Sequence, residues 1–515
     1  MVTKKLCSLL LCICLLCPVM GFAQAEEKAD TYTGFKDVTL DLFLNMTWMS
    51  NSRMQWTGII PEAITERTGV KLQTTVCLDD QELGMMMAGG ELPDLIFTDK
   101  PLDRLSSSKF CYSYNELIEQ YGLDWEPDPQ LIQNSRLYSG TDDYYMLLTT
   151  YYTQEQLDAA HGIPNLPTLL VRDDILDELG NPPMETLDDF MNVLGMVKEK
   201  YPDLVPYMPA DYSNWGNDCF RSYFHMPSSF DYVEQEDGSI IHYTQDENYE
   251  DYVRYLNTMY RKGYTPADAY SLDGSSKNSA LTNGQYFSYA NCTDGKSYAS
   301  SNTLQQAVPN GRIGEHDFLS EGDKFYSDGI GWAGVFISKN CKNPEAAIRF
   351  MQFMFTEEGK RLSQWGREGI EWTLGADGLP VYSDEWVEAS LDMDLMTSKY
   401  QRDFYISSDG IVEMEGRIAP LPKELQDYYL QTLKPHIYVC PWLGASVPRG
   451  GIDEVNIYNR VAEVSRSGEV SIILSESDEE FERNLETLRN NLKQVGIDKL
   501  LAYMTEQAGI YRKLY

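Results

Sequence analysis

The N-terminal part of the chain alternates between strand-like and helix-like segments, and this order restricts the possible folds more than any other feature. Apolar and polar residues alternate over residues 38–44 and again over 70–76, which is typical of strands. Helical patterns cover residues 59–68 and 83–88, and a short apolar strand follows at 95–97. Strands that alternate with helices in this way form a parallel sheet through right-handed crossovers. The sequence therefore predicts an α/β fold.

A second unit, further along the chain, supplies one more strand and two helices. Residues 331–338 are rich in apolar and β-branched side chains, as in a buried strand. The triplet Asn343–Glu345 then forms a helix start, with a capping side chain, a proline at the first helical position and an acid in the first turn. Apolar residues follow at helical spacing, and a second short helix ends near Gly366. We expect this unit to pack onto the sheet, with Trp365 in its core.

The first 25 residues have the features of a secretory signal peptide. Lys4 and Lys5 precede an apolar run over residues 6–19, and the triplet Ala23–Ala25 places small residues at a cleavage site. The run is too short to span a membrane comfortably. We therefore expect a secreted mature chain that begins at Glu26 and lies outside the cytoplasmic membrane.

The chain is strongly acidic, with 79 Asp and Glu against 42 Lys and Arg and a formal net charge of −37. Such a charge repels nucleic acid and anionic membrane surfaces, so neither is expected as a partner. The cysteines beyond the signal peptide form no CxxC pair, so we expect small buried residues and no disulfide framework. The sequence has no P-loop, GxGxxG, GxSxG, HExxH or zinc-type motif. We therefore expect no enzyme activity, no cofactor and no metal site.

Three stretches carry a resemblance to a known family. They are GGELPDLIFTD at residues 89–99, NPEAAIRFMQFMFTEEGKRL at 343–362 and NLETLRNNLKQVGIDKLLAYMTEQ at 484–507. In this order they resemble the extracellular solute-binding proteins of family 1, the ligand receptors of ABC importers, and within them the large carbohydrate-type branch. Many such proteins are lipoproteins anchored through a cysteine after a small residue. Cys12, Cys14 and Cys17 each follow a large apolar residue, so the sequence leaves a lipid anchor open.

The resemblance implies a two-lobed periplasmic-binding-protein-like fold with a hinge and an interlobe cleft. Lobe one would take residues 26–160 and about 325–370, and lobe two about 161–324 and 371–515. Some polysaccharide-binding members have a calcium loop of alternating Asp and Asn after the helix that opens lobe two. Residues 200–206 of this chain, KYPDLVP, depart from that pattern, so the calcium site is not carried over.

Polar and aromatic side chains follow the predicted strands at their carboxyl ends, where ligands bind in open α/β sheets. Asn45 and Trp48 follow the first strand, Asp80 follows the second and Asp99 follows the third. Aromatic faces pack on the apolar face of a pyranose, and carboxylates accept hydrogen bonds from its hydroxyls. The same side chains also suit the capping of turns and helices, so both interpretations stay open. Further ligand-binding residues are predicted beside the segments that join the lobes and in an aromatic, polar stretch of lobe two: Tyr152, Trp215, Tyr289, Trp332 and Trp372.

The resemblance further implies capture of a carbohydrate by interlobe closure and delivery to the transmembrane permease subunits of an ABC importer. An oligosaccharide is the favoured ligand, in keeping with 9 Trp and 35 Tyr, and the receptor is expected as a monomer. Two alternatives remain open. A secreted glycoside hydrolase needs only a pair of carboxylates, and 79 acids supply many pairs by chance. A peptide- or lipid-binding receptor could use the same two-lobed scaffold.

Overall fold

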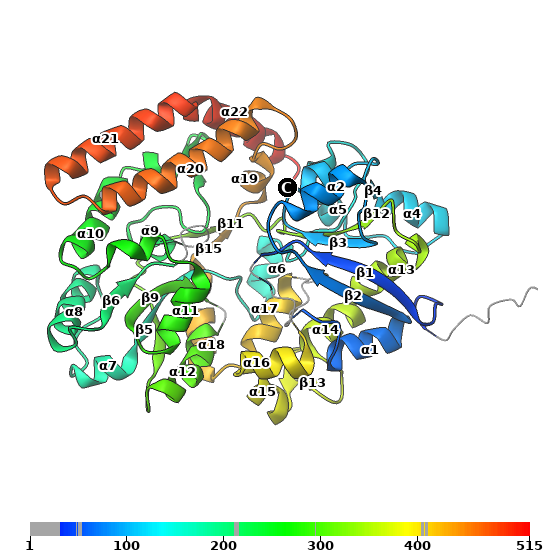
Figure 1. The fold of residues 1–515 in the computed structure, drawn as a ribbon, viewed down its shortest axis with the longest axis horizontal. Coiled ribbons are helices and arrows are strands. Elements are labelled where there is room, and N and C mark those ends of the chain that lie inside the picture. The colour runs from blue at the N-terminus through cyan, green and yellow to red at the C-terminus, as the bar shows by residue number, and fades with distance from the viewer. Residues whose placement is uncertain are drawn as a thin grey trace, which may run out of the picture.

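The chain folds into two α/β lobes that lie side by side in the computed structural model (Figure 1). The structure describes residues 31–47, 49, 54–210, 216–293, 295–402, 406 and 410–515. Lobe one, on the right of the view, contains the N-terminal strands, and lobe two, on the left, contains the three long C-terminal helices. Among the described residues, no helix combines the length and apolar character needed to cross a membrane.

Lobe one is built on a five-stranded sheet in the order β2-β1-β3-β12-β4. β1 pairs in parallel with β2 and β3, whereas β12 runs antiparallel between β3 and β4. The predicted parallel sheet is therefore confirmed for the first three strands, and the strand predicted at 331–338 inserts in the opposite direction. The strand bounds are β1 Val38–Leu44, β2 Val70–Val76, β3 Leu95–Thr98, β4 Cys111–Tyr112 and β12 Gly334–Ser338.

Helices cover both sides of this sheet (Figure 1). α13 begins as the sequence predicts, because the Asn343 side chain accepts a hydrogen bond from the Ala346 N–H at 3.0 Å. Its apolar face, including Phe350 and Met354, is completely buried in the lobe-one core. The lobe-one helices are α1 Ile59–Thr68, α2 Glu82–Gly89, α3 Leu102–Leu105, α4 Tyr114–Tyr121, α5 Pro129–Ser139, α13 Pro344–Met354 and α14 Glu357–Trp365.

Lobe two has a four-stranded sheet in the order β10-β5-β9-β6, in which β9 runs parallel to β6 and antiparallel to β5. A capping box formed by Thr186 and Asp189 is present at the start of α8. The described cysteines are all buried, as expected. The sheet strands are β5 Pro167–Arg172, β6 Val205–Met208, β9 Tyr286–Cys292 and β10 Ile313–His316, and the hairpin strands are β7 Tyr232–Glu234 and β8 Ile240–His242. The helices before the C-terminal group are α7 Asp173–Glu178, α8 Leu187–Lys200, α9 Asp218–Tyr223, α10 Tyr249–Arg261, α11 Gly274–Thr282 and α12 Lys296–Ala307.

The C-terminal helices complete the lobe-two core. The apolar stripe on α21, which includes Phe481, Leu485, Leu488 and Leu492, is buried, and α20 packs against both α10 and α21. The helices are α19 Pro441–Ser446, α20 Asp453–Ile473, α21 Asp478–Val495 and α22 Ile497–Tyr511.

Several short elements lie where the chain passes between the lobes (Figure 1). β11 pairs in parallel with β15, although about a hundred residues separate them in the sequence. Gly331 lies in one of the passing segments with φ +93°, and a Cβ there would meet the Thr149 carbonyl oxygen at 2.6 Å, so only glycine fits. The remaining bounds are α6 Gln154–Ala159, β11 Phe325–Ser327, β13 Trp372–Leu374, β14 Pro380–Tyr382, α15 Asp384–Ser390, α16 Met393–Leu395, α17 Gly410–Ile418, α18 Lys423–Asp427 and β15 Ile437–Val439.

The buried residues divide between the lobes differently from the predicted boundary at 370. Trp386, Met396 and Tyr400 were expected in lobe two, but they pack in the same core cluster as the lobe-one sheet. Trp386 stacks on Tyr382 with ring centroids 5.4 Å apart, and Tyr400 meets it edge-on. The segment after α14 therefore stays with lobe one until it reaches α17. The pattern of apolar residues in this segment fits packing against the core of either lobe, so the sequence alone does not assign it.

Candidate functional site

The carboxyl edge of the lobe-one sheet brings three segments together. Leu44 at the end of β1 is in register with Phe97, and Thr98 at the end of β3 is in register with Gly334 at the start of β12. Asn45 follows β1 and is 2% exposed. Its Nδ2 donates to Thr98 Oγ1 at 3.0 Å and to the Lys100 carbonyl at 2.9 Å. Asn45 therefore fixes the loop after β3, and its side chain is turned into the protein.

Two carboxylates lie on this edge. Asp80 is exposed and pairs with Lys100 at 3.1 Å, which is a surface ion pair of small energetic value. Asp99 is next in sequence to that lysine and is also exposed in part, while desolvation raises the pKa of its carboxyl. Both carboxylates can accept hydrogen bonds from hydroxyl groups of a ligand. The Asp80 carboxylate also raises the pKa of Asp99, and the role of both residues in ligand binding stays a prediction.

Among the predicted aromatic residues, Trp332 is described at this edge, and its side chain is partly exposed. Its ring meets Phe97 edge-on, with centroids 5.8 Å apart. Its Nε1 donates to Thr150 Oγ1 at 3.1 Å, and that hydroxyl donates in turn to Glu413 Oε2 at 3.1 Å. Glu413 lies on α17, so these bonds connect the lobe-one edge to two of the segments that join the lobes. The orientation of the indole is consequently fixed.

Three other predicted residues are buried and hold the protein together. The Tyr152 hydroxyl is hydrogen-bonded to Ser327 Oγ at 2.5 Å, which ties two joining segments. Tyr289 is 2% exposed, since β9 is buried along its whole length. Trp372 is also 2% exposed, packs edge-on against Trp365 and donates from Nε1 to the Gly366 carbonyl at 2.9 Å. All three side chains are thus buried within the protein, and their contact with a ligand stays a prediction. The predictions for Trp48 and Trp215 lie outside the described residues.

Lobe two has a polar pocket that sequence reasoning did not identify. This lobe-two pocket, with a volume of about 170 Å³, lies between α9, the loop before β7 and α20. Arg221 is its most buried cation, with an ion pair to Asp218 and a second to Asp231 at 3.0 Å. Desolvation raises the pKa of Asp218 to about 6, whereas Arg221 holds the pKa of Asp231 below its usual value. The sequence indicates the aromatic, polar stretch of lobe two, but no local pattern connects it to its partners from α20.

The end of β6 is anchored close to this pocket. The buried Lys277 on α11 donates from Nζ to the Ala210 carbonyl at 2.9 Å. The Ala210 N–H donates to the Gly216 carbonyl at 2.9 Å, and the Tyr207 hydroxyl donates to Asn217 Oδ1 at 2.6 Å. Both ends of the connection from β6 to α9 are therefore held by buried groups. Gly216 and Asn217 also line the lobe-two pocket.

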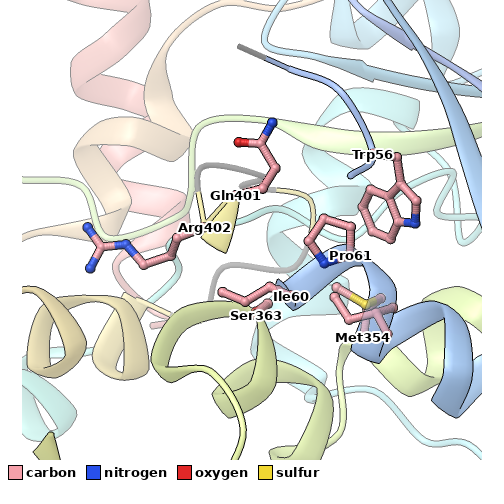
Figure 2. A pocket seen from close by; sticks show the side chains of 8 residues that line it. Trp56, Ile60, Pro61, Met354, Ser363, Gln401 and Arg402 are labelled. Atoms are coloured by element: carbon pink, nitrogen blue, oxygen red, sulfur yellow. The ribbon is translucent and has the colours of Figure 1, made fainter. Parts of the chain in front are cut away.

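A second hollow, in lobe one, is lined by apolar side chains and leaves no room for a water molecule (Figure 2). Trp56, Ile60 and Pro61 come from α1 and the segment before it, and Met354 faces them from α13. Arg402 lies at its margin. This hollow is a packing gap in the core. Within the described ranges, no group of three or more His, Cys, Asp or Glu side chains is arranged to hold a metal ion.

Solved structures with the same architecture match nearly the whole chain. The alginate-binding protein AlgQ2, solved without calcium ion, has a TM-score of 0.68 and 16% identity, covering 94% of this chain and 100% of that chain. The ABC-transporter substrate-binding protein FusA of S. pneumoniae, in complex with kestose, has a TM-score of 0.68 and 15% identity over 93% of this chain and 100% of its own. At these identities the likeness shows the fold, which is the predicted two-lobed fold with a hinge and an interlobe cleft.

A curated relative matches part of the chain. Lipoprotein LipO of Bacillus subtilis (strain 168) is 24% identical over 242 residues, which are 44% of this chain and 44% of that protein. The chain thus spans less than half the length of this relative. The model of the bacterial extracellular solute-binding proteins matches residues 62–389, which is more than half of the chain. The protein therefore belongs to the bacterial extracellular solute-binding protein family.

Proposed function

We propose that the protein is the receptor of an ABC importer that captures an oligosaccharide between its lobes. The observation that carries this proposal is the carboxyl edge of the lobe-one sheet, which carries both the fixed, half-buried indole of Trp332 and the exposed carboxylates of Asp80 and Asp99. An aromatic face with hydrogen-bond acceptors beside it suits a pyranose ring. Two structures with the same fold are described as binding alginate and as holding kestose, and both ligands are carbohydrates.

Closure of the lobes would complete the site. Asp80, Asp99 and Trp332 would contact the sugar from lobe one, and the aromatic residues predicted from the sequence add Trp48 on this lobe and Trp215 on the other. A ligand that touches both lobes binds the closed form more tightly than the open form and shifts the population toward it. The closed form would then be recognised by the permease subunits. Because Trp332 bonds to Thr150 and through it to Glu413, its position depends on the joining segments.

The site is proposed to act outside the cytoplasmic membrane, after removal of the signal peptide. We propose a mature N-terminus at Glu26 without lipid, although the curated relative is named a lipoprotein. Mass spectrometry of the protein purified from its native envelope measures this directly. A chain that begins at Glu26 supports the proposal. A diacylglycerol-modified cysteine at position 12, 14 or 17 contradicts it and shows a lipid anchor instead.

The central test is a binding titration with kestose, alginate oligosaccharides and other glycans of three to six units. We expect at least one to bind with a Kd on the order of micromolar, near −8 kcal/mol, and to be recovered intact. Release of reducing ends above a control without protein would favour the glycoside hydrolase. Binding of peptides in the absence of any glycan binding would favour the peptide receptor. Each alternative therefore has its own result.

A further inference from the structure

The lobe-two pocket combines rigid hydrogen-bonding groups in one place. The Arg221 side chain is 4% exposed, and its guanidinium is held by Asp218 and Asp231 and lies over the Tyr243 ring at 4.4 Å. Glu469, also 4% exposed, accepts a hydrogen bond from the Tyr252 hydroxyl at 3.1 Å. Groups that are already fixed by their neighbours lose little freedom when a ligand arrives. The pocket therefore offers preformed donors and acceptors.

An aromatic wall stands beside these charges. Tyr232 and Tyr458 stack with centroids 5.6 Å apart and an angle of 21° between the rings. Both tyrosines line the pocket, and Tyr458 and the exposed Arg466 come from the same helix, α20. Tyr232 is 2% exposed, so it is the partly exposed ring of Tyr458, next to carboxylates and guanidinium groups, that can bind the apolar face of a sugar while the charged groups bind its hydroxyls.

Size and charge restrict the ligand further. A volume of about 170 Å³ has room for roughly ten water-sized positions, comparable to the approximately twelve non-hydrogen atoms of one hexose. The pocket is lined by Asp218, Asp231 and Glu469 against Arg221 and Arg466, so carboxylates outnumber guanidinium groups. A sugar acid would add a further negative charge beside them, which is unfavourable where solvent screening is weak. The composition favours a neutral sugar.

We propose that the lobe-two pocket is a subsite for one neutral hexose unit and that the transported ligand is accordingly a neutral glycan, not a polyuronate. The proposal rests on the proposed function as a carbohydrate receptor and adds the charge class of its ligand. All residues that line the pocket belong to lobe two. The subsite therefore does not depend on closure of the lobes and can be tested with single sugars.

The test is a titration of the full mature chain with D-glucose, D-galactose, D-mannose and D-fructose, followed by saturation-transfer NMR, with D-glucuronate and D-galacturonate in parallel. We expect at least one neutral hexose to bind saturably in the millimolar range and the uronates to bind at least about tenfold more weakly. Tyr458→Ala and Arg466→Ala should each weaken the hexose about tenfold. Arg460→Ala is the matched control, because Arg460 is an exposed arginine of the same helix that does not line the pocket.

Two results would overturn the subsite. One is the absence of binding by all four hexoses, and the other is hexose binding that neither Tyr458→Ala nor Arg466→Ala weakens. Melting temperatures of the variants, compared with that of Arg460→Ala, separate a loss of binding from a loss of folding. If oligosaccharides from the glycan panel bind but one of these two results is found for the pocket, the receptor function stands and only the subsite is rejected. If a hexose binds in the pocket but no oligosaccharide binds, the receptor function is rejected.

Discussion

Polar side chains buried in lobe one bond mainly to backbone, whereas those buried in lobe two around its pocket bond to one another. In lobe one, Asp94 is 3% exposed and accepts from the Asp41 N–H at 2.9 Å and the Lys342 N–H at 2.8 Å. Asn45 holds the loop after β3 in the same manner. These groups fix the ends of strands. They pin the edge at which Trp332 and the exposed carboxylates lie.

In lobe two, the buried groups form a charged network. Arg221 joins Asp218 and Asp231, and Tyr252 bonds to Glu469 from the neighbouring helix α10. A buried ion pair stabilises a protein weakly compared with apolar packing, because both charges lose their hydration. On the proposal of a lobe-two subsite, this network holds the groups that line the pocket in place. The comparison shows that buried polar groups in lobe one fix the ends of the strands at the sheet edge, while those in lobe two form the walls of a polar cavity.

The largest expected effect comes from breaking the lobe-two network. Arg221→Leu leaves Asp218 and Asp231 without their cation, so we expect a loss of about 3–5 kcal/mol in the free energy of unfolding. Urea denaturation at pH 7.5 measures it. Arg67→Leu is the control in lobe one, since Arg67 pairs with Glu358 on the surface and should cost less than about 1 kcal/mol. Equal losses in the two variants would contradict the distinction between the lobes.

A second prediction concerns pH, and it also separates the lobes. His242 in lobe two is buried, and desolvation lowers its pKa from 6.5 to about 4, with Arg221 acting in the same direction and Asp231 against it. Below pH 6.5 the unfolded chain binds a proton at His242 that the folded chain does not bind. The contribution of His242 to the free energy of unfolding is therefore lost as the pH falls toward 4. The loss amounts to about 3 kcal/mol.

His242→Gln removes this titration and keeps a polar side chain opposite Thr244, which lies 2.8 Å from His242 Nδ1. The measurement is the free energy of unfolding of both proteins between pH 7 and pH 4. We expect the difference between them to shrink by about 3 kcal/mol across that range, because only the wild-type chain loses this contribution. A difference that is constant with pH would show that His242 titrates normally in the folded protein.

The scaffold was largely predictable because local signals determine it. The alternation over residues 38–97 predicts three strands of the lobe-one sheet, and the predicted cap at Asn343 accepts the expected backbone hydrogen bond. Trp365, 1% exposed, is in the core as predicted. Each of these features depends on residues close together in the sequence, so the pattern alone contains the information.

The site was less predictable because distant segments build it. Carboxyl ends of neighbouring strands must meet at one edge, which placed Asp80, Asp99 and Asn45 correctly at the lobe-one edge but did not reveal that Asn45 points inward. The burial of Tyr289 and Trp372 depends on what covers them, and aromatic residues suit a core as well as a cleft. The lobe-two pocket joins Asp231 to Glu469 across more than two hundred residues. No local pattern connects those positions.

A third prediction tests the lobe-one edge through its tryptophan. Trp332→Ala should weaken binding of the glycan selected by the panel by about 2 kcal/mol, because an aromatic anchor is lost, while Trp332→Phe should retain part of the affinity. Trp365→Ala should instead cost about 3–5 kcal/mol of stability, since that indole is buried and donates to the Val412 carbonyl at 2.8 Å. Calorimetric titration and thermal unfolding give the two quantities. Full affinity in Trp332→Ala would remove this residue from the site.

The smallest expected effect lies at the junction of the two lobes, at Thr150. This β-branched residue has φ +60°, a left-handed conformation that costs about 1–2 kcal/mol for a residue with a side chain. Thr150→Ala and Thr150→Gly both remove the hydroxyl that accepts from Trp332 and donates to Glu413. They differ in the backbone, because glycine alone adopts a positive φ without strain.

At an ordinary helix or strand position, glycine is less stable than alanine by about 0.5–1 kcal/mol. At residue 150 the order should reverse, and we expect Thr150→Gly to exceed Thr150→Ala by about 1 kcal/mol in the free energy of unfolding, measured by urea denaturation. The reversal is diagnostic because lost hydrogen bonds are common to both variants and cancel in the comparison. If Thr150→Ala is the more stable of the two variants, residue 150 does not hold the left-handed conformation in solution. The hydrogen bonds that connect Trp332 to the joining segments are then arranged differently.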